Sequence, residues 1–287
     1  MYTQQVQSLG SGFLVSSDGY ILTNDHVAGN AAEITVTMTS GEKYEAELVG
    51  NDQLSDVALL KINGAKLPFL RLGNSDDVII GEWAIAFGNP FGLFDISDKP
   101  TVTVGVVSAT NMNLRTQGGR SYRGMIQTDA SINSGNSGGP LVNSVGEVIG
   151  LNSVIYTPNE GSVGVGFSIP INRVKTIMEE LRRTGKVNRD FNTGLEVHAV
   201  DGRVARYFGL ERAEGVIVSD VEAGSPGDRG GFKAGDIILE VHGEKIDNET
   251  TLISILDSAK PGSILPVKVW RSREVVELKL RMEKKSI

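Results

Sequence analysis

The sequence contains no cysteine among its 287 residues. This absence excludes disulfide bonds, thiolate-bound zinc and thiol nucleophiles, and it leaves the cellular compartment open. Basic residues are outnumbered as well: 28 Lys and Arg stand against 35 Asp and Glu, for a formal net charge of −7. With no basic run, this balance argues against nucleic acid or an anionic membrane surface as the main partner.

Long apolar runs are also missing. No stretch approaches the roughly eighteen uninterrupted apolar residues of a membrane-spanning helix. Residues 1–10, "MYTQQVQSLG", have neither the basic start nor the apolar core of a secretion signal. No membrane segment is therefore expected in this chain.

Short β-prone runs, punctuated by Gly, Asn, Asp and Ser, fill residues 12–170 without an intervening helical period. This pattern is typical of an antiparallel sandwich or barrel. A helix is predicted over 171–185, because apolar residues from Val174 to Leu181 share one face and Gly185 follows as a stop. The sequence thus predicts one domain over 1–186, ending in this connecting helix, and a small α+β domain over 187–287.

A glycine-rich stretch surrounds one serine in "SINSGNSGGPLV", residues 131–142. Glycines beside Ser137 allow close approach of the backbone to a ligand. A serine hydroxyl becomes a good nucleophile when a base takes its proton, a third group orients that base, and backbone N–H groups receive the oxyanion.

The chain holds three histidines to act as that base. His26 ends the apolar strand pattern "YILTNDHV", whereas His198 and His242 lie in alternating strand patterns and are expected to be half-exposed. Asp56 stands directly before an apolar run, where a carboxylate needs a partner. Asp25 adjoins His26, but neighbours on an extended chain point to opposite faces, so Asp56 is the expected partner.

Three blocks, "TNDHV", "SDVALLKI" and "GNSGGPLV", follow one another in the order of the chymotrypsin-like clan, and "EGVIVSDVEAGSPGDRGGFKAGDIILEVHGEKI" over 214–246 resembles a PDZ domain. Together they resemble the HtrA/Deg family of serine proteases. The resemblance implies a mainly β fold, a chymotrypsin-like double β-barrel protease domain followed by a small α+β PDZ domain. It makes His26, Asp56 and Ser137 the catalytic triad, with an oxyanion hole at Gly135, Asn136 and Ser137.

The same resemblance places the specificity pocket and the peptide-binding groove. Ser131, at the base of the S1 pocket, supplies no carboxylate for Lys or Arg, and Ile132 narrows an apolar pocket with Gly164 and Gly166 in a second wall. Cleavage after small or branched apolar residues is expected. In the PDZ domain the resemblance assigns the peptide groove to Thr193, Gly194, Leu195, Val197, Ile253 and Leu256.

Two long polar loops, 88–100 and 111–124, correspond to loops that order the site and relay signals in the family. Their arginines, Arg115, Arg120 and Arg123, are interpreted either as relay contacts or as parts of a solvated loop. By resemblance, the peptide bond between Ser134 and Gly135 is turned away in a resting form. A peptide with a free C-terminus would then activate the enzyme through the PDZ domain.

The predicted function is an ATP-independent serine endopeptidase that cleaves misfolded or unfolded proteins, because no Gly-x-x-x-x-Gly-Lys-Ser/Thr loop is present to bind a nucleotide. The alternative is a non-proteolytic peptide-binding or chaperone protein on the same scaffold. The resemblance implies protein quality control during stress in the periplasm or another extracytoplasmic compartment, with C-terminal peptides and unfolded chains as partners and a homotrimer as the assembly. No cofactor and no metal are expected.

Overall fold

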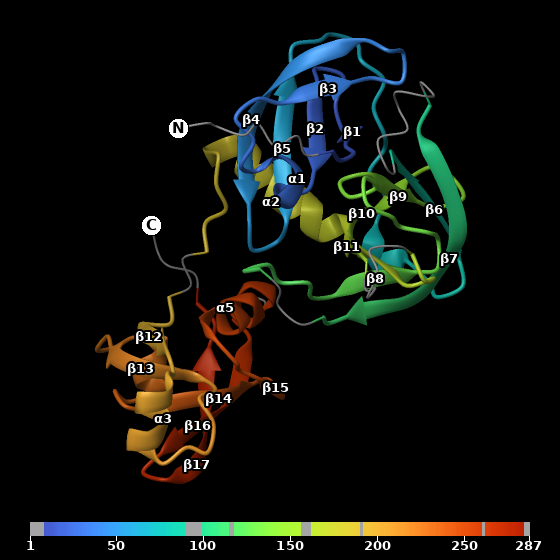
Figure 1. The fold of residues 1–287 in the computed structure, drawn as a ribbon. Coiled ribbons are helices and arrows are strands. Elements are labelled where there is room, and N and C mark those ends of the chain that lie inside the picture. Colours follow the sequence, from blue (N-terminus) through green and yellow to red (C-terminus); the bar gives the residue numbers. More distant parts are fainter. Residues whose placement is uncertain are drawn as a thin grey trace, which may run out of the picture. The chain divides into compact units, whose positions relative to one another are not determined.

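The structure is a computed structural model that describes residues 9–89, 99–114, 118–155, 162–189, 192–259 and 262–283. Arg115 and most of the predicted loop 88–100 lie outside these ranges. The chain divides into two compact units, Met1–Val187 and Asn188–Ile287 (Figure 1). Among the described residues, no helix combines the length and apolar character needed to span a membrane.

The first sheet of the first unit has five strands in the order β1-β2-β5-β4-β3. They are β1 (Phe13–Leu14), β2 (Tyr20–Thr23), β3 (Thr35–Thr37), β4 (Lys43–Asp52) and β5 (Val57–Ile62). The turn at 16–20 joins β1 to β2, and Gly19 takes a φ of 100° there, which favours glycine. β5 is central and buried along almost its whole length, so Asp56 enters the core directly before it.

The second sheet closes into a six-stranded barrel in the order β10-β11-β8-β7-β6-β9. Its strands are β6 (Trp83–Gly88), β7 (Thr101–Met112), β8 (Met125–Thr128), β9 (Pro140–Val142), β10 (Val148–Ile155) and β11 (Gly166–Pro170). The register of β10 against β11 shifts between Asn152 and Val154, so that Ser153 is the extra residue of a bulge. Bulges re-aim side chains, and this one lies beside the site described below.

Helix α2 (Ile171–Thr184) packs on β4 and β5 of the first sheet and on β10 and β11 of the barrel. Its apolar stripe is buried at Ile171, Val174, Ile177 and Leu181. The left-handed Gly185 ends it with an N–H bond to the carbonyl of Leu181. The predicted helix is therefore confirmed, with its end one residue earlier than expected. A short 3₁₀ turn, η1 (Ser75–Asp77), precedes β6.

The second unit is built on a sheet in the order β12-β13-β14-β16-β17, with β15 paired to β14. Its strands are β12 (Leu195–Ala199), β13 (Val216–Val221), β14 (Ile237–Val241), β15 (Glu244–Lys245), β16 (Ile264–Arg271) and β17 (Glu274–Arg281). The helices are α3 (Gly202–Phe208), α4 (Pro226–Arg229) and α5 (Glu249–Ser258). β12 is an edge strand, and such an edge can accept a further strand.

Two local predictions were wrong. The chain around His26 is not extended, because Asp25–Ala28 form one helical turn, α1. Neighbouring side chains therefore need not point to opposite faces there. His242 is not on a strand: it follows the end of β14, is exposed and has a φ of 53°. His198 lies on β12 as predicted, with a side chain that is 61% exposed.

Candidate active site

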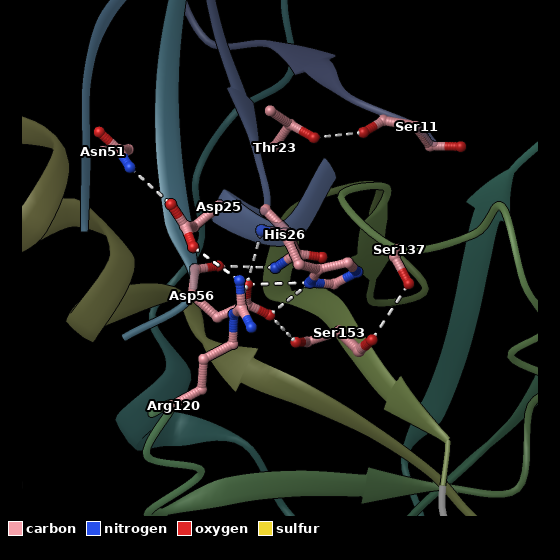
Figure 2. A network of polar contacts seen from close by, with 10 residues as sticks. Ser11, Thr23, Asp25, His26, Asn51, Asp56, Arg120, Ser137 and Ser153 are labelled. Atoms are coloured by element: carbon pink, nitrogen blue, oxygen red, sulfur yellow. Dashed lines mark hydrogen bonds and ion pairs between the residues drawn. The ribbon is translucent and has the colours of Figure 1, made fainter. Parts of the chain in front are cut away.

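His26 and Asp56 meet between α1 and the start of β5 (Figure 2). The ring Nδ1 of His26 lies 2.9 Å from each carboxylate oxygen of Asp56. The backbone N–H of His26 donates to the same carboxylate at 3.1 Å. The imidazole is one-third exposed, whereas Asp56 is completely buried. One edge of the ring is thus fixed, and the other remains accessible.

Asp56 takes an unusual backbone conformation, with a φ of 56°. A left-handed non-glycine residue is strained by about 1–2 kcal/mol and persists where its surroundings hold it. The holding contacts are present: Asn24 donates through Nδ2 to the carbonyl of Asp56 at 2.8 Å, and Ser153 donates through Oγ to Oδ2 at 2.5 Å. Asn24 thus holds the backbone of Asp56, while His26 and Ser153 orient its carboxylate before any substrate arrives.

Ser137 lies near the accessible edge of His26 in Figure 2, but its hydroxyl donates to the carbonyl of Ser153 at 3.1 Å. A turn from Asn133 to Asn136 precedes it, closed by a 2.9 Å backbone bond, and Gly135 within the turn has a φ of 97°. Within the described part of the chain, the N–H groups of Gly135 and Ser137 donate to no acceptor. Both are thus free to bind a ligand.

The glycines after Ser137 serve close backbone packing. At Gly138, where φ is 86°, a β-carbon would lie 2.1 Å from the carbonyl oxygen of Ser11, and at Gly139 one would lie 2.1 Å from that of Phe87. A side chain at either position would push the serine turn away from β1 and β6. The structure therefore explains these two glycines by packing against neighbouring backbone.

Ser11 stabilises the turn before Ser137 by hydrogen bonds. Its hydroxyl donates to the carbonyl of Gly135 at 2.6 Å and accepts from the N–H of Asn89 at 2.9 Å. Its backbone N–H donates to the carbonyl of Ser137 at 2.9 Å. The segment before β1 therefore holds both ends of the three-residue sequence that contains the two free N–H groups.

Arg120 connects two buried carboxylates. Its Nε donates to Asp56 Oδ1 at 3.1 Å and its Nη2 to Asp25 Oδ2 at 2.9 Å, and Asn51 donates to the other oxygen of Asp25 at 2.6 Å. Burial acts to lower the pKa of Arg120, but the hydrogen bond to Asp25 and the charge of Asp56 outweigh it, so the pKa lies above its usual value. Arg120 is cationic whenever the protein is folded.

Comparisons with known proteins give a match for each of the two units. A family profile described as a trypsin-like peptidase domain matches residues 10–151, and one described as a PDZ domain matches residues 181–282. The solved structure of the HtrA-type protease AlgW with decapeptide is 37% identical with a TM-score of 0.66, over 97% of this chain and 83% of that one. The chain belongs to the HtrA family of serine proteases.

Three further similar proteins are named serine endoproteases. The serine endoprotease from Yersinia pestis is 34% identical with a TM-score of 0.62, over 99% of this chain and 92% of that one. A probable periplasmic serine endoprotease, DegP-like, of Ectopseudomonas mendocina is 44% identical over 96% of this chain and 56% of its own length. That of Chlamydia trachomatis is 42% identical over 94% and 52%. The chain spans about half the length of these curated relatives.

The family and the fold class expected from the sequence, a mainly β trypsin-like domain followed by a PDZ domain, are confirmed. The predicted S1 residues occupy different surroundings. Ile132 is fully buried in the barrel core, and a β-carbon on Gly166 would lie 2.6 Å from its side chain. The carbonyl of Ser131 accepts from Thr103 at 2.8 Å, whereas Gly164 faces open space. A side chain at position 166 would therefore clash with Ile132.

In the PDZ unit, five of the six predicted residues meet at one apolar cavity of about 150 Å³. Thr193, Leu195 and Val197 line it from the β12 side, and Ile253 and Leu256 line it from α5. Gly194 lies instead in a neighbouring polar cavity of about 290 Å³ beside Glu196, Asp220 and Glu222. The sequence reasoning missed further lining residues, namely Phe232, Ile238, Val241, Leu252, Val267 and Leu280.

Sequence reasoning also missed several side chains of the site in the HtrA-type domain. Ser153, Ser11, Asn51 and the pairing of Arg120 with Asp25 carry no local motif. A weak signal existed for Asp25, which is a charged residue next to His26. Its backbone was taken as extended, however, and so its side chain was assigned to the opposite face.

Proposed function

We propose that this chain is an ATP-independent serine endopeptidase in which Ser137 is the nucleophile, His26 the general acid and base, and Asp56 the residue that orients the imidazole. The observation that supports this most strongly is the contact between the buried Asp56 and His26, in which Nδ1 of the ring lies 2.9 Å from both carboxylate oxygens. That contact keeps the proton on Nδ1 and leaves Nε2 as the base.

The reaction would begin when the Ser137 hydroxyl turns from the carbonyl of Ser153 towards His26 Nε2. As Oγ attacks the scissile carbonyl carbon, its proton passes to Nε2, and the imidazolium is stabilised by Asp56. The N–H groups of Gly135 and Ser137, on either side of Asn136, would bind the oxyanion. His26 then gives its proton to the leaving amine, and water hydrolyses the acyl-enzyme by the same steps.

The specificity pocket would favour small or branched apolar residues on the acyl side of the cut. Ser131 offers no carboxylate to pair with a basic side chain, and the neighbouring Ile132 is apolar and fully buried. Gly164, where a side chain would face open space, leaves room for a substrate strand along this wall.

The PDZ unit would bind peptides by adding a strand to β12, with the terminal apolar side chain in the 150 Å³ cavity. Thr193 to Leu195 would receive the carboxylate, and binding would stimulate the protease unit. Unfolded chains are the proposed substrates. An extracytoplasmic location is supported by the relatives that are named periplasmic. A homotrimer stays a prediction.

Labelling with a fluorophosphonate probe tests the proposal, followed by peptide mapping and by hydrolysis of casein. We expect the probe on Ser137, and Ser137→Ala should lose labelling and at least about 10⁴-fold in turnover. Ser144→Ala is the matched control, because Ser144 is exposed in the β9–β10 turn. Cuts mapped by mass spectrometry should follow Val, Ile, Ala or Leu.

Three results would contradict it. Retention of a tenth of the activity by Ser137→Ala would exclude Ser137 as nucleophile. A majority of cuts after Lys or Arg would overturn the pocket assignment. Absence of labelling, with and without an apolar C-terminal peptide, would favour the non-proteolytic peptide-binding alternative.

A further inference from the structure

The pair of Arg120 and Asp25 is not needed for the chemistry described above, yet it is built into the same buried network. Asp25 is almost fully buried, and its carboxylate contacts Asn51 on one side and Arg120 on the other. Gly29 leaves the space for this arrangement, since a β-carbon there would lie 2.1 Å from Asp25 Oδ1. The site is therefore shaped around the carboxylate of Asp25.

Charge explains why the two residues occur together. Asp25 and Asp56 carry two negative charges that share one guanidinium (Figure 2). With Arg120 the group has a net charge of −1 beside a neutral imidazole, and it becomes neutral when His26 accepts a proton. Without Arg120, two buried carboxylates would favour the imidazolium already in the resting protein.

We propose that Asp25 and Arg120 form a charge-balancing pair for the His26–Asp56 couple, which positions the carboxylate and sets the pH range in which His26 is available as a base. Arg120 is a positioning residue, because it acts through Asp56. The pair also makes the couple depend on the segment 118–124, which carries Arg120. This inference rests on the proposed function.

Other charged or titratable groups around the couple do not substitute for the pair. Burial, together with the charge of Asp56, raises the pKa of Tyr122 to about 12, so this group stays neutral across the working range. Asp52 accepts from the N–H of Ser55 at 3.1 Å, and Arg173 of α2 donates to the hydroxyl of Ser55 at 3.0 Å. These two contact the residue before Asp56.

The test compares Arg120→Gln, Asp25→Asn and the double variant across pH 5 to 10. A charge within about 4–6 Å shifts a titration by roughly 1–3 units. In Arg120→Gln we expect the acid limb of kcat/KM to move up by about 1 unit, which is roughly a tenfold loss on the acid side of the limb with recovery near pH 9. In Asp25→Asn the limb should move down.

The double variant is decisive, because it removes one charge of each sign. Its acid limb should return to within about 0.3 units of the wild type, an estimate well below the shift that one nearby charge causes. Arg182→Gln is the matched control. It removes the same positive charge, but from helix α2, where Arg182 lies over the ring of Tyr20. Its limb should not move.

A second readout does not depend on proteolysis. NMR of ¹⁵N-labelled imidazoles follows the titration of His26, identified by the signal that His26→Gln lacks. We expect the same directions of shift as in the kinetics. Unchanged titration in both single variants, or a double variant that fails to return, would overturn the charge balance. Unchanged titration together with a lower rate at every pH would assign Arg120 a structural role only.

If Arg120→Gln unfolds, Arg120→Lys keeps the charge and should leave the limb in place, whereas a shift as large as the one expected for Arg120→Gln would refute the inference. Failure of the proposed function would look different. In that case wild-type protein would hydrolyse nothing at any pH, while the NMR titrations would still show whether the pair balances the charge of the couple.

Discussion

Removing the hydroxyl of Ser11 should impair the turn that presents the two free N–H groups. Ser11→Ala loses the 2.6 Å bond to the carbonyl of Gly135 and the 2.9 Å bond from the N–H of Asn89. The backbone bonds of Ser11 and the bond that closes the turn from Asn133 to Asn136 are unaffected. The substitution therefore removes only the two hydrogen bonds of the Ser11 hydroxyl.

The magnitude follows from the number of bonds. Two hydrogen bonds at about 0.5–1.5 kcal/mol each give a loss of about 1–3 kcal/mol in the free energy of unfolding. Loss of one oxyanion donor lowers turnover by about 10²–10³. Because the turn stays closed, we expect a smaller fall in kcat, roughly 10- to 100-fold.

Steady-state hydrolysis of a small peptide substrate measures this effect, with urea unfolding as the stability assay. The fall should appear in kcat with KM within about threefold, because the lost interaction acts on the transition state. A peptide boronate that mimics the tetrahedral intermediate should bind more weakly in parallel. Wild-type kcat in Ser11→Ala, or a change confined to KM, would refute the reasoning, and Ser144→Ala should show neither effect.

Two further predictions concern Tyr122 and the PDZ cavity. The pKa of Tyr122 is raised in the folded state, mainly by burial, to about 12 from an ordinary value of 10.0, so its contribution to stability is complete below pH 10 and is lost as the pH rises towards 12. Tyr122→Phe should reduce the loss of unfolding free energy between pH 10 and 12 by up to about 2–3 kcal/mol, as measured by urea unfolding. An identical loss in both proteins would contradict the assignment. In the PDZ cavity, Ile253→Ala should weaken an apolar C-terminal peptide by roughly fivefold in fluorescence polarisation, by loss of about 1 kcal/mol of burial. Ile264→Ala, on β16 outside the cavity lining, is the control, and equal weakening by both would exclude the cavity. Gly194→Asp cannot be used to test carboxylate binding at residues 193–195, because a β-carbon at position 194 would lie 2.0 Å from the β-carbon of Ser225 and would disturb the local fold.

The sequence by itself determined those features whose signals lie within a few residues of one another. The alternating runs of both units, the helix over Ile171–Thr184 and the glycine-rich turn before Ser137 all depend on local periodicity or on backbone freedom. The order of three short blocks was sufficient to select His26 and Asp56, and the structure brings these two together. The same order of blocks selected Ser137, but it did not predict that the Ser137 hydroxyl donates to the carbonyl of Ser153.

Only the tertiary structure decided which side chains surround that pair. Ser153 reaches Asp56 across 97 residues, Arg120 reaches Asp25 across 95, and Ser11 reaches Gly135 across 124. Such contacts depend on how the five-stranded sheet, the barrel and the segment 118–124 pack, and no local pattern encodes that packing. Asp25 shows the limit most clearly, because a single helical turn at residues 25–28 changed the direction of its side chain and made it a partner of Arg120.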